Sequence, residues 1–258
     1  MQPHPPISIT ILGSGTSTGV PVIGCRCRVC ASGDPRDNRT RSSALVQVAG
    51  KNILIDSSTD LRQQALRHRI SHIDAVLYTH THADHVNGID DLRVFNMISG
   101  AGIPIYGSAG DLLSLKKTFH YIFDEDLEEG YRPQLIPCPI EAAFELFGLL
   151  VTPIPLIHGS GAAQGYRIGN FAYLTDCSAI PETSKSLLMA LDELVLDGLR
   201  HSPHSSHFNI SQAIEATSNL GARRTWLTHL SHDVLHARDE KLLPPKVFFA
   251  HDGLCLHL

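Results

Sequence analysis

The chain has 258 residues, of which 43% are hydrophobic and 18% charged, and its formal net charge is −5. This composition supplies enough apolar material for a core and excludes an intrinsically disordered protein. The weak negative charge argues against a dedicated nucleic-acid or membrane-surface binder, and a small phosphorylated substrate stays open as a partner.

At the amino end, residues 1–10 lack the basic start and the apolar stretch of a secretory signal peptide. No stretch of the sequence approaches the ~20 apolar residues that a membrane-spanning helix needs. We therefore expect a cytoplasmic protein with no membrane partner. The sequence has no repeat and no long Gly/Ser linker, so we predict one domain over residues 1–258.

Short apolar runs rich in β-branched residues recur along the chain and predict strands. They cover 7–13, 43–50, 52–57, 74–80, 103–107, 149–158, 166–176, 193–198, 225–229 and a hairpin-like stretch at 246–258. Helical patterns fall between them, at 58–70, 83–99, 111–123, 181–192, 209–221 and after residue 232. Ser58 or Thr59 is the expected cap of the first helix, and Gly221 ends the fifth. Two mixed sheets stacked face to face, with helices outside, would satisfy this order, as would other α/β layouts.

The stretch "THTHADH" at 79–85 directly follows the apolar run "IDAVLY". Because side chains alternate along an extended segment, His80 and His82 can approach one ion. Asp84 and His85 would then lie in the first turn of the next helix, aimed at the same space. Unrelated polar residues at a strand end are the alternative, but so many ligating groups in one loop favour a metal site.

This motif resembles the signature of the metallo-β-lactamase superfamily, and the resemblance spans nearly the whole chain. It implies further ligands at later strand ends, where this sequence has His158, Asp176 and His229. By this resemblance one metal is held by His80, His82 and His158, the other by Asp84, His85 and His229, and Asp176 bridges the two. Asp56, which ends "NILID", matches a buried aspartate of the superfamily that supports the histidine loop without binding a metal itself.

The resemblance also implies a four-layer αββα sandwich, an α/β (α+β) fold of two mixed sheets with helices outside. Two ions about 4 Å apart would hold a hydroxide as the nucleophile of a hydrolysis. Mixed imidazole and carboxylate ligands suit Zn²⁺, Mn²⁺ or Fe²⁺, and the residue types do not rank these metals.

Three cysteines form the pattern C-X-C-X-X-C at Cys25, Cys27 and Cys30. Thiolates need a positive partner at neutral pH, so we predict a structural Zn²⁺ here rather than reduced cysteines on a flexible loop. His232, three residues after His229, is the expected fourth ligand. This combination resembles the phosphodiesterases of the carbon–phosphorus lyase (phosphonate breakdown) pathway. The other cysteines, at 138, 177 and 255, are expected to be buried apolar residues.

A glycine-rich loop, "LGSGTSTGVPVIGC", lies between the first predicted strand and the cysteines. Such a loop is weak support for phosphate binding by itself. It is similar to loops of tRNase Z and of cyclic phosphodiesterases, which implies a phosphodiester substrate. Five arginines surround it, and we leave them outside the site as either phosphate contacts or solvated surface: Arg26, Arg28, Arg36, Arg39 and Arg41.

Cleavage of a phosphodiester needs a proton for the departing alkoxide, and histidine suits that task near neutral pH. By its resemblance to the phosphodiesterase pattern, His207 is the expected general acid, and Asn209 caps the helix that follows. His201 and His204 are expected to be surface residues. We therefore expect His207 and Asp84 to take part in catalysis.

The leading hypothesis is a dinuclear metal-dependent phosphodiesterase that acts on a small diester, for which the resemblance suggests a phosphoribosyl 1,2-cyclic phosphate. A tRNase Z-like RNA 3′-end endonuclease is an alternative, but the acidic segment 124–130 would repel an RNA backbone, so we expect no nucleic-acid partner. A further alternative is a non-hydrolytic metal-binding protein of the pyrroloquinoline-quinone pathway type. The oligomeric state stays open, with a homodimer as one option.

Overall fold

In this computed structural model of the chain, residues 6–124 and 132–258 are described. The amino-terminal residues 1–5 lie outside the described part. So does most of the acidic segment 124–130 that we weighed against RNA binding.

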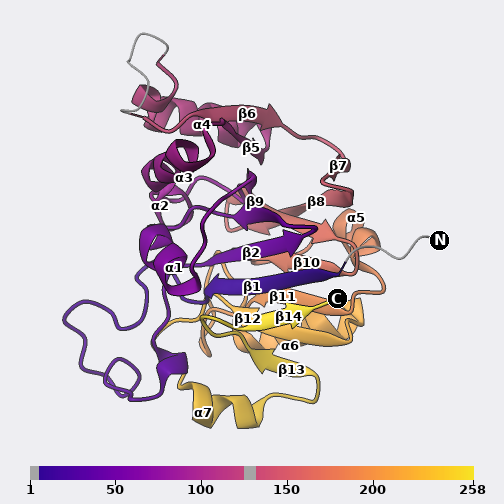
Figure 1. Cartoon of the computed structure of the whole chain (residues 1–258). Coiled ribbons are helices and arrows are strands. Elements are labelled where there is room, and N and C mark those ends of the chain that lie inside the picture. Colours follow the sequence, from indigo (N-terminus) through magenta and orange to yellow (C-terminus); the bar gives the residue numbers. More distant parts are fainter. Residues whose placement is uncertain (1–5, 125–131) are drawn as a thin grey trace.

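Within the described residues, two seven-stranded mixed sheets lie face to face (Figure 1). The first sheet has the order β14-β1-β2-β3-β4-β5-β6 and the second the order β13-β12-β11-β10-β9-β8-β7. The strands of the first are β1 (Ile7–Gly13), β2 (Ser43–Val48), β3 (Lys51–Ile55), β4 (Ala75–Leu77), β5 (Ile103–Gly107), β6 (Leu135–Pro139) and β14 (Cys255–His257). The strands of the second are β7 (Phe144–Leu146), β8 (Leu149–His158), β9 (Gly161–Ile168), β10 (Phe171–Leu174), β11 (Glu193–Asp197), β12 (Arg224–Thr228) and β13 (Val247–Phe249).

Helices cover the outer face of each sheet. Those that accompany the first sheet are α1 (Leu61–His68), α2 (Ala83–Val86), α3 (Leu92–Ser99) and α4 (Ala109–Thr118), and those of the second are α5 (Glu182–Lys185), α6 (Ile210–Leu220) and α7 (His236–Asp239). Short 3-10 turns complete the set at Pro35–Asp37, Ile89–Asp91, His120–Ile122, Ser186–Leu188 and Glu240–Leu242. No helix among the described residues combines the length and the apolar character that crossing a membrane requires.

Three apolar clusters fill the three spaces between these four layers. The central cluster joins side chains of the first sheet, such as Ile9 and Val46, to Tyr166 and Tyr173 of the second, all completely buried. A second cluster lies between the first sheet and its helices, and a third between the other sheet and α6. Each fully buried aliphatic side chain contributes ~1.5–3 kcal/mol. The predicted αββα sandwich is therefore confirmed.

Several predicted strands have the observed bounds, among them 7–13, 103–107 and 149–158. The predicted run 166–176 is wrong as one strand, because it contains the end of β9 and all of β10, joined at Gly169 with a φ of +58°. The predicted hairpin at 246–258 is also wrong. β13 pairs with β12 in the second sheet and β14 pairs with β1 in the first, so this segment crosses between the layers.

The predicted helix 83–99 is broken at Gly88, where an added Cβ would lie 2.1 Å from the carbonyl oxygen of Ser58. The expected caps of α1 are wrong. Asp60 holds the cap position without a side-chain hydrogen bond to the helix, and its carboxylate pairs with Arg41. For α6 both ends are confirmed, since Asn209 caps its amino end and Gly221 ends it in the left-handed conformation.

Candidate dinuclear metal centre

The site lies where strand ends of the two sheets meet. Asp56 follows β3 and the histidine loop follows β4 in the first sheet, while His158 ends β8 and Asp176 and His229 follow β10 and β12 in the second. Three of these residues, Asp56, Asp176 and His229, have left-handed φ values of +61°, +54° and +59°. Such a conformation is uncommon for residues other than glycine and is enriched at functional sites. It turns the chain sharply at each strand end and leaves these side chains in the shared space.

The first group of side chains is His80, His82 and His158. His158 Nε2 lies 3.3 Å from His82 Nδ1 and 3.7 Å from Asp176 Oδ2, and His80 Nε2 lies 3.6 Å from the same oxygen. His158 Nδ1 donates to the carbonyl oxygen of Ser206, which leaves Nε2 unprotonated and available as a ligand. This group can therefore surround one cation together with Asp176.

The second group is Asp84, His85 and His229. Asp84 Oδ2 lies 3.3 Å from His85 Nε2 and 3.5 Å from His229 Nε2. The other oxygen of Asp176, Oδ1, lies 3.2 Å from His85 Nε2 and 3.4 Å from His229 Nε2. Each oxygen of Asp176 thus faces one group, which is the arrangement that a bridging carboxylate requires.

The unsatisfied polar atoms of the site fit a pair of cations. Among the described residues, four buried ligand atoms that face the cluster have no hydrogen-bond partner: His80 Nε2, His85 Nε2, His229 Nε2 and Asp84 Oδ2. Buried polar atoms without partners are rare in folded proteins, because each costs ~1–3 kcal/mol. Ligands bound to one zinc ion at about 2.1 Å in tetrahedral geometry lie about 3.4 Å apart, close to the separations observed here.

The electrostatics of the site also favour cations. Burial alone would raise the pKa of Asp176, but His229 and His85 lower it well below its ordinary value. Burial would likewise raise the pKa of Asp84, and the nearby imidazoles of His229 and His85 lower it instead. Both carboxylates therefore stay ionised in a buried site, where divalent cations would neutralise them.

Asp56 supports the histidine loop from below. It is completely buried, accepts hydrogen bonds from the backbone N–H and the hydroxyl of Thr79, and accepts one from His85 Nδ1 at 2.7 Å. The last bond fixes the tautomer that leaves His85 Nε2 free for a metal. Burial raises the pKa of Asp56.

Replacing Asp56 with asparagine should weaken metal binding at the cluster roughly 10–100-fold, because the carboxylate that orients His85 is lost. Titration of metal against a competing chelator measures this. Asp74→Asn is a matched control. Asp74 lies just before β4, at the end of the strand away from the histidine loop, and pairs with the exposed Lys51. Unchanged affinity in Asp56→Asn would show that Asp56 does not support the ligands.

His207, the expected general acid, lies beside the cluster. Its ring stacks on His229 with centroids 4.7 Å apart, and its Nε2 lies 3.9 Å from Asp176 Oδ2. Its Nδ1 donates to Asp197 Oδ2 at 2.7 Å. Asp197 is completely buried, and burial raises its pKa. His207 is therefore held with Nε2 toward the space where a substrate would react, while His201 and His204 are exposed, as expected.

Asp197 was not among the residues singled out in the sequence. It is the last residue of β11, in "ELVLD", and Asp56 and Asp176 likewise stand at the carboxyl ends of their strands. An aspartate at a third strand end was therefore a usable signal. It was missed because "ELVLD" contains no histidine that marks it as part of a ligand motif.

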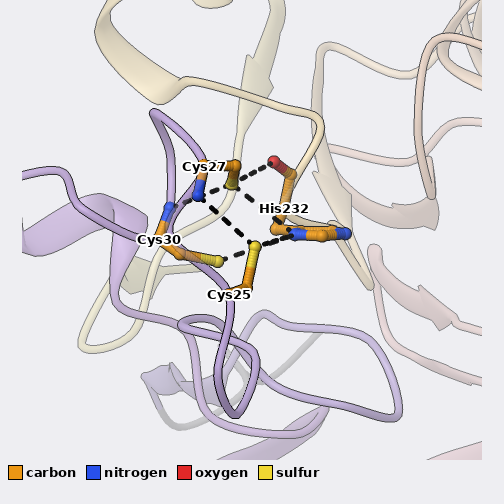
Figure 2. Close-up of side chains that lie close together, drawn as sticks. All are labelled: Cys25, Cys27, Cys30 and His232. Atoms are coloured by element: carbon orange, nitrogen blue, oxygen red, sulfur yellow. Dashed lines mark hydrogen bonds between the residues drawn. The ribbon is translucent and has the colours of Figure 1, made fainter.

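The three predicted cysteines and His232 come together in a second cluster of metal-ligating side chains (Figure 2). The sulfurs of Cys25, Cys27 and Cys30 lie 3.4, 3.6 and 3.6 Å from His232 Nδ1. Backbone N–H groups donate to each sulfur, from Cys27, Cys30 and Val22 respectively. The hydrogen bond from the Cys30 N–H lowers the pKa of Cys27 to about 6. This donor set fits a closed tetrahedral zinc site.

Arg39 holds the two segments of this cysteine–histidine site together. Its guanidinium is completely buried, pairs with Asp37, and donates to the carbonyl oxygens of Ser231 and Val234 on either side of His232. Arg36 pairs with Asp34, and Arg41 pairs with Asp60. Three of the five arginines near the loop thus form ion pairs within the chain. Arg39 also joins its own segment to the segment that carries His232.

Replacing Cys27 with serine should remove one metal ion per chain. The metal ions of the His/Asp cluster should stay bound. Loss of a site that ties residues 25–30 to 232 should lower the free energy of unfolding by roughly 2 kcal/mol, or about 4–8 °C in Tm for a chain of this size. Cys138→Ser is the control, because Cys138 lies in β6 outside the cluster. An unchanged metal count in Cys27→Ser would refute the structural site.

The expectation that the other three cysteines are buried apolar residues is confirmed only for Cys177. Cys177 is completely buried and Cys138 is half-buried, but Cys255 is exposed on β14, where its sulfur lies 3.3 Å from Ser8 Oγ. Side chains alternate along β14, so Leu256 points into the core while Cys255 and His257 point to solvent. In the glycine-rich loop, an added Cβ at Gly13 would lie 1.9 Å from the Arg41 carbonyl oxygen. That glycine is explained by close backbone packing.

The sandwich and its histidine–aspartate cluster define a protein of the metallo-β-lactamase type. The family model of the beta-lactamase superfamily domain matches residues 51–230, and the chain belongs to that superfamily. Within it, the chain resembles the crystal structure of a diphosphatase from the PhnP family, with 45% identity, a TM-score of 0.92 and coverage of 98% of this chain and 97% of that one.

Two curated relatives carry other names. An octanoyltransferase of Porphyromonas gingivalis is 42% identical over 249 residues, which are 95% of this chain and 50% of the relative, so the chain spans about half of that protein. A coenzyme PQQ synthesis protein B of Methylorubrum populi is 32% identical over 226 residues, covering 74% of this chain and 72% of the relative. The resemblance to the superfamily is confirmed, and the relatives differ in the activity that their names state.

Proposed function

We propose that this chain is a dinuclear metal-dependent phosphodiesterase that hydrolyses a small phosphodiester. The observation that carries the proposal is Asp176, whose two oxygens face two separate groups of histidine and carboxylate ligands. Two divalent cations bound there, Zn²⁺, Mn²⁺ or Fe²⁺, would activate water and neutralise the phosphate oxygens. The 45% identity to a PhnP-family diphosphatase supports reaction at phosphorus.

The residues of the chain would divide the remaining work. Asp176 and Asp84 supply negative charge that holds the cations, and Asp56 and the Ser206 carbonyl orient His85 and His158. His207 would protonate the departing oxygen through Nε2, because its Nδ1–H is committed to Asp197. General acid catalysis of this kind contributes roughly 10²–10⁴-fold. A diphosphate loses a phosphate, which needs less protonation than the alkoxide of a phosphodiester, so the metal ligands suit either link and His207 matters more for the diester.

A panel of phosphodiesters tests the proposal on protein with its metals bound. Bis(4-nitrophenyl) phosphate and ribosyl 1,2-cyclic phosphates should be hydrolysed, and a small dinucleoside diphosphate tests the alternative link. Metal-containing protein that cleaves none of these would refute the proposal. If the protein cleaves only the diphosphate, the chain is a diphosphatase, like the PhnP-family relative, and not a phosphodiesterase.

The similarity to coenzyme PQQ synthesis protein B favours a second candidate, a metal-binding protein of cofactor biosynthesis that is not a hydrolase. The same panel discriminates, since this candidate should bind metal without cleaving any diester. The name octanoyltransferase belongs to a protein of which this chain matches half. Among the described residues that line the hollow beside the His/Asp cluster there is no cysteine or lysine nucleophile for acyl transfer.

A further inference from the structure

A hollow of about 560 Å³ opens beside the dinuclear cluster. Its lining includes His80, His82 and His158, which form the first ligand group. The rest of the lining comes from Thr81 in the histidine loop, the β8–β9 turn with the start of β9, the loop before His207 and the first turn of α4. A group attached to phosphorus at the cluster would therefore extend into this hollow.

Beyond the histidines, the lining residues with polar side chains carry hydroxyls or a carboxylate: Thr81, Ser160, Ser205, Ser206 and Asp111. Among the described residues that line the hollow there is no lysine or arginine. Proteins hold phosphate groups with arginine forks, lysines or backbone N–H groups at helix ends. A second phosphate in this hollow would meet no cationic side chain there.

Asp111 is held at the amino end of α4. The Ser108 hydroxyl donates to Asp111 Oδ2, and Ser108 Oγ accepts the backbone N–H of Asp111. Within the described residues no hydrogen bond is donated to Asp111 Oδ1, so this carboxylate keeps acceptor capacity. The amino end of α4 would attract an anion, but this position already carries the negative charge of Asp111.

We propose that this hollow binds the uncharged, hydroxyl-bearing alcohol portion of the substrate, such as an unphosphorylated sugar, and that Asp111 selects it by accepting hydrogen bonds from its hydroxyls. The inference rests on the phosphodiesterase function proposed above and narrows its substrate class. A phosphomonoester dianion in the same hollow would be repelled by the carboxylate. Between a ribosyl 1,2-cyclic phosphate and its 5-phosphorylated form, the chain should therefore prefer the form without the second phosphate.

The test compares kcat/KM for these two substrates with the full chain and its metals bound. The wild-type protein should prefer the unphosphorylated substrate by about tenfold or more, a repulsion of the size expected for charges a few ångströms apart near a protein surface. Asp111→Asn removes the charge and should reduce the preference to about threefold or less. Asp111→Glu keeps the charge and should keep the preference.

The matched control is Glu141→Gln, which removes one negative charge from an exposed position outside the hollow and should retain the wild-type preference.

A second measurement, of inhibition, uses the wild-type protein alone. Ribose 1-phosphate should inhibit hydrolysis of bis(4-nitrophenyl) phosphate more strongly than ribose 1,5-bisphosphate does.

The failures of the two proposals are distinguishable. Equal rates on both ribosyl substrates, a preference for the phosphorylated one, or stronger inhibition by the bisphosphate would overturn the role of Asp111 while the phosphodiesterase function stands. Metal-containing protein that cleaves neither ribosyl substrate nor bis(4-nitrophenyl) phosphate would instead remove the proposed function.

Discussion

Replacing Asp176 with asparagine should reduce phosphodiesterase activity at least ~10³-fold and lower the metal content of the His/Asp cluster. Asparagine keeps the size of the side chain, but it is neutral and offers only one oxygen as a ligand. In the wild-type chain Oδ2 lies near His80 and His158, and Oδ1 lies near His85 and His229, so both metal positions lose a ligand or a charge. Kinetics and elemental analysis of the same preparation measure both effects.

Asp192→Asn is the matched control for this substitution. Asp192 lies just before β11, at the opposite end of the strand from Asp197, and pairs with the exposed Arg223. Its activity and metal content should equal those of the wild-type protein. An Asp176→Asn variant that retains both metals and full activity would mean that Asp176 does not bridge the two positions.

Replacing His207 with alanine should spare the metals and slow turnover by roughly 10²–10⁴-fold for substrates with alkoxide leaving groups. The reason is that His207 contributes a proton rather than a ligand, with Nδ1 donating to the buried Asp197 and Nε2 facing Asp176. Substrates with a 4-nitrophenolate leaving group need little protonation and should lose less. Measuring kcat for a series of leaving groups gives this dependence.

His201→Ala provides the comparison, because His201 is exposed in the same loop and pairs with Asp239 away from the cluster. It should retain both metals and the full rate. Loss of metal from His207→Ala would mean instead that His207 is a ligand. That outcome is a meaningful alternative, since His207 Nε2 lies close enough to Asp176 and His229 to share an ion with them.

The candidate site was predictable because its ligands stand at strand ends, where short apolar runs mark them. His158, Asp176 and His229 each follow such a run, and the loop 79–85 gathers four ligating groups in one place. Parallel pairing of β3 with β4 and of β10, β11 and β12 then brings the carboxyl ends of these strands to one edge. The ligand residues could therefore be predicted from the local sequence, and strand pairing explains why they lie close together.

Features that depend on long-range packing were not predictable. The stretch 246–258 has the local pattern of a hairpin, but β13 pairs in parallel with β12 while β14 pairs with β1, because each sheet has an open edge for one of them. Arg39 resembles its surface neighbours in sequence and is buried only because it meets carbonyl groups about 190 residues away. The role of Asp111 likewise follows from the hollow, which no local pattern reveals.

Anomalous X-ray diffraction from crystals of protein purified without chelator tests the central claim most directly. Two peaks about 3.5–4 Å apart should lie on either side of Asp176, each contacting one of its carboxylate oxygens. A third peak should lie among Cys25, Cys27, Cys30 and His232. A single peak in the His/Asp cluster, or a pair that Asp176 does not join, would contradict the dinuclear centre on which the proposed hydrolysis depends.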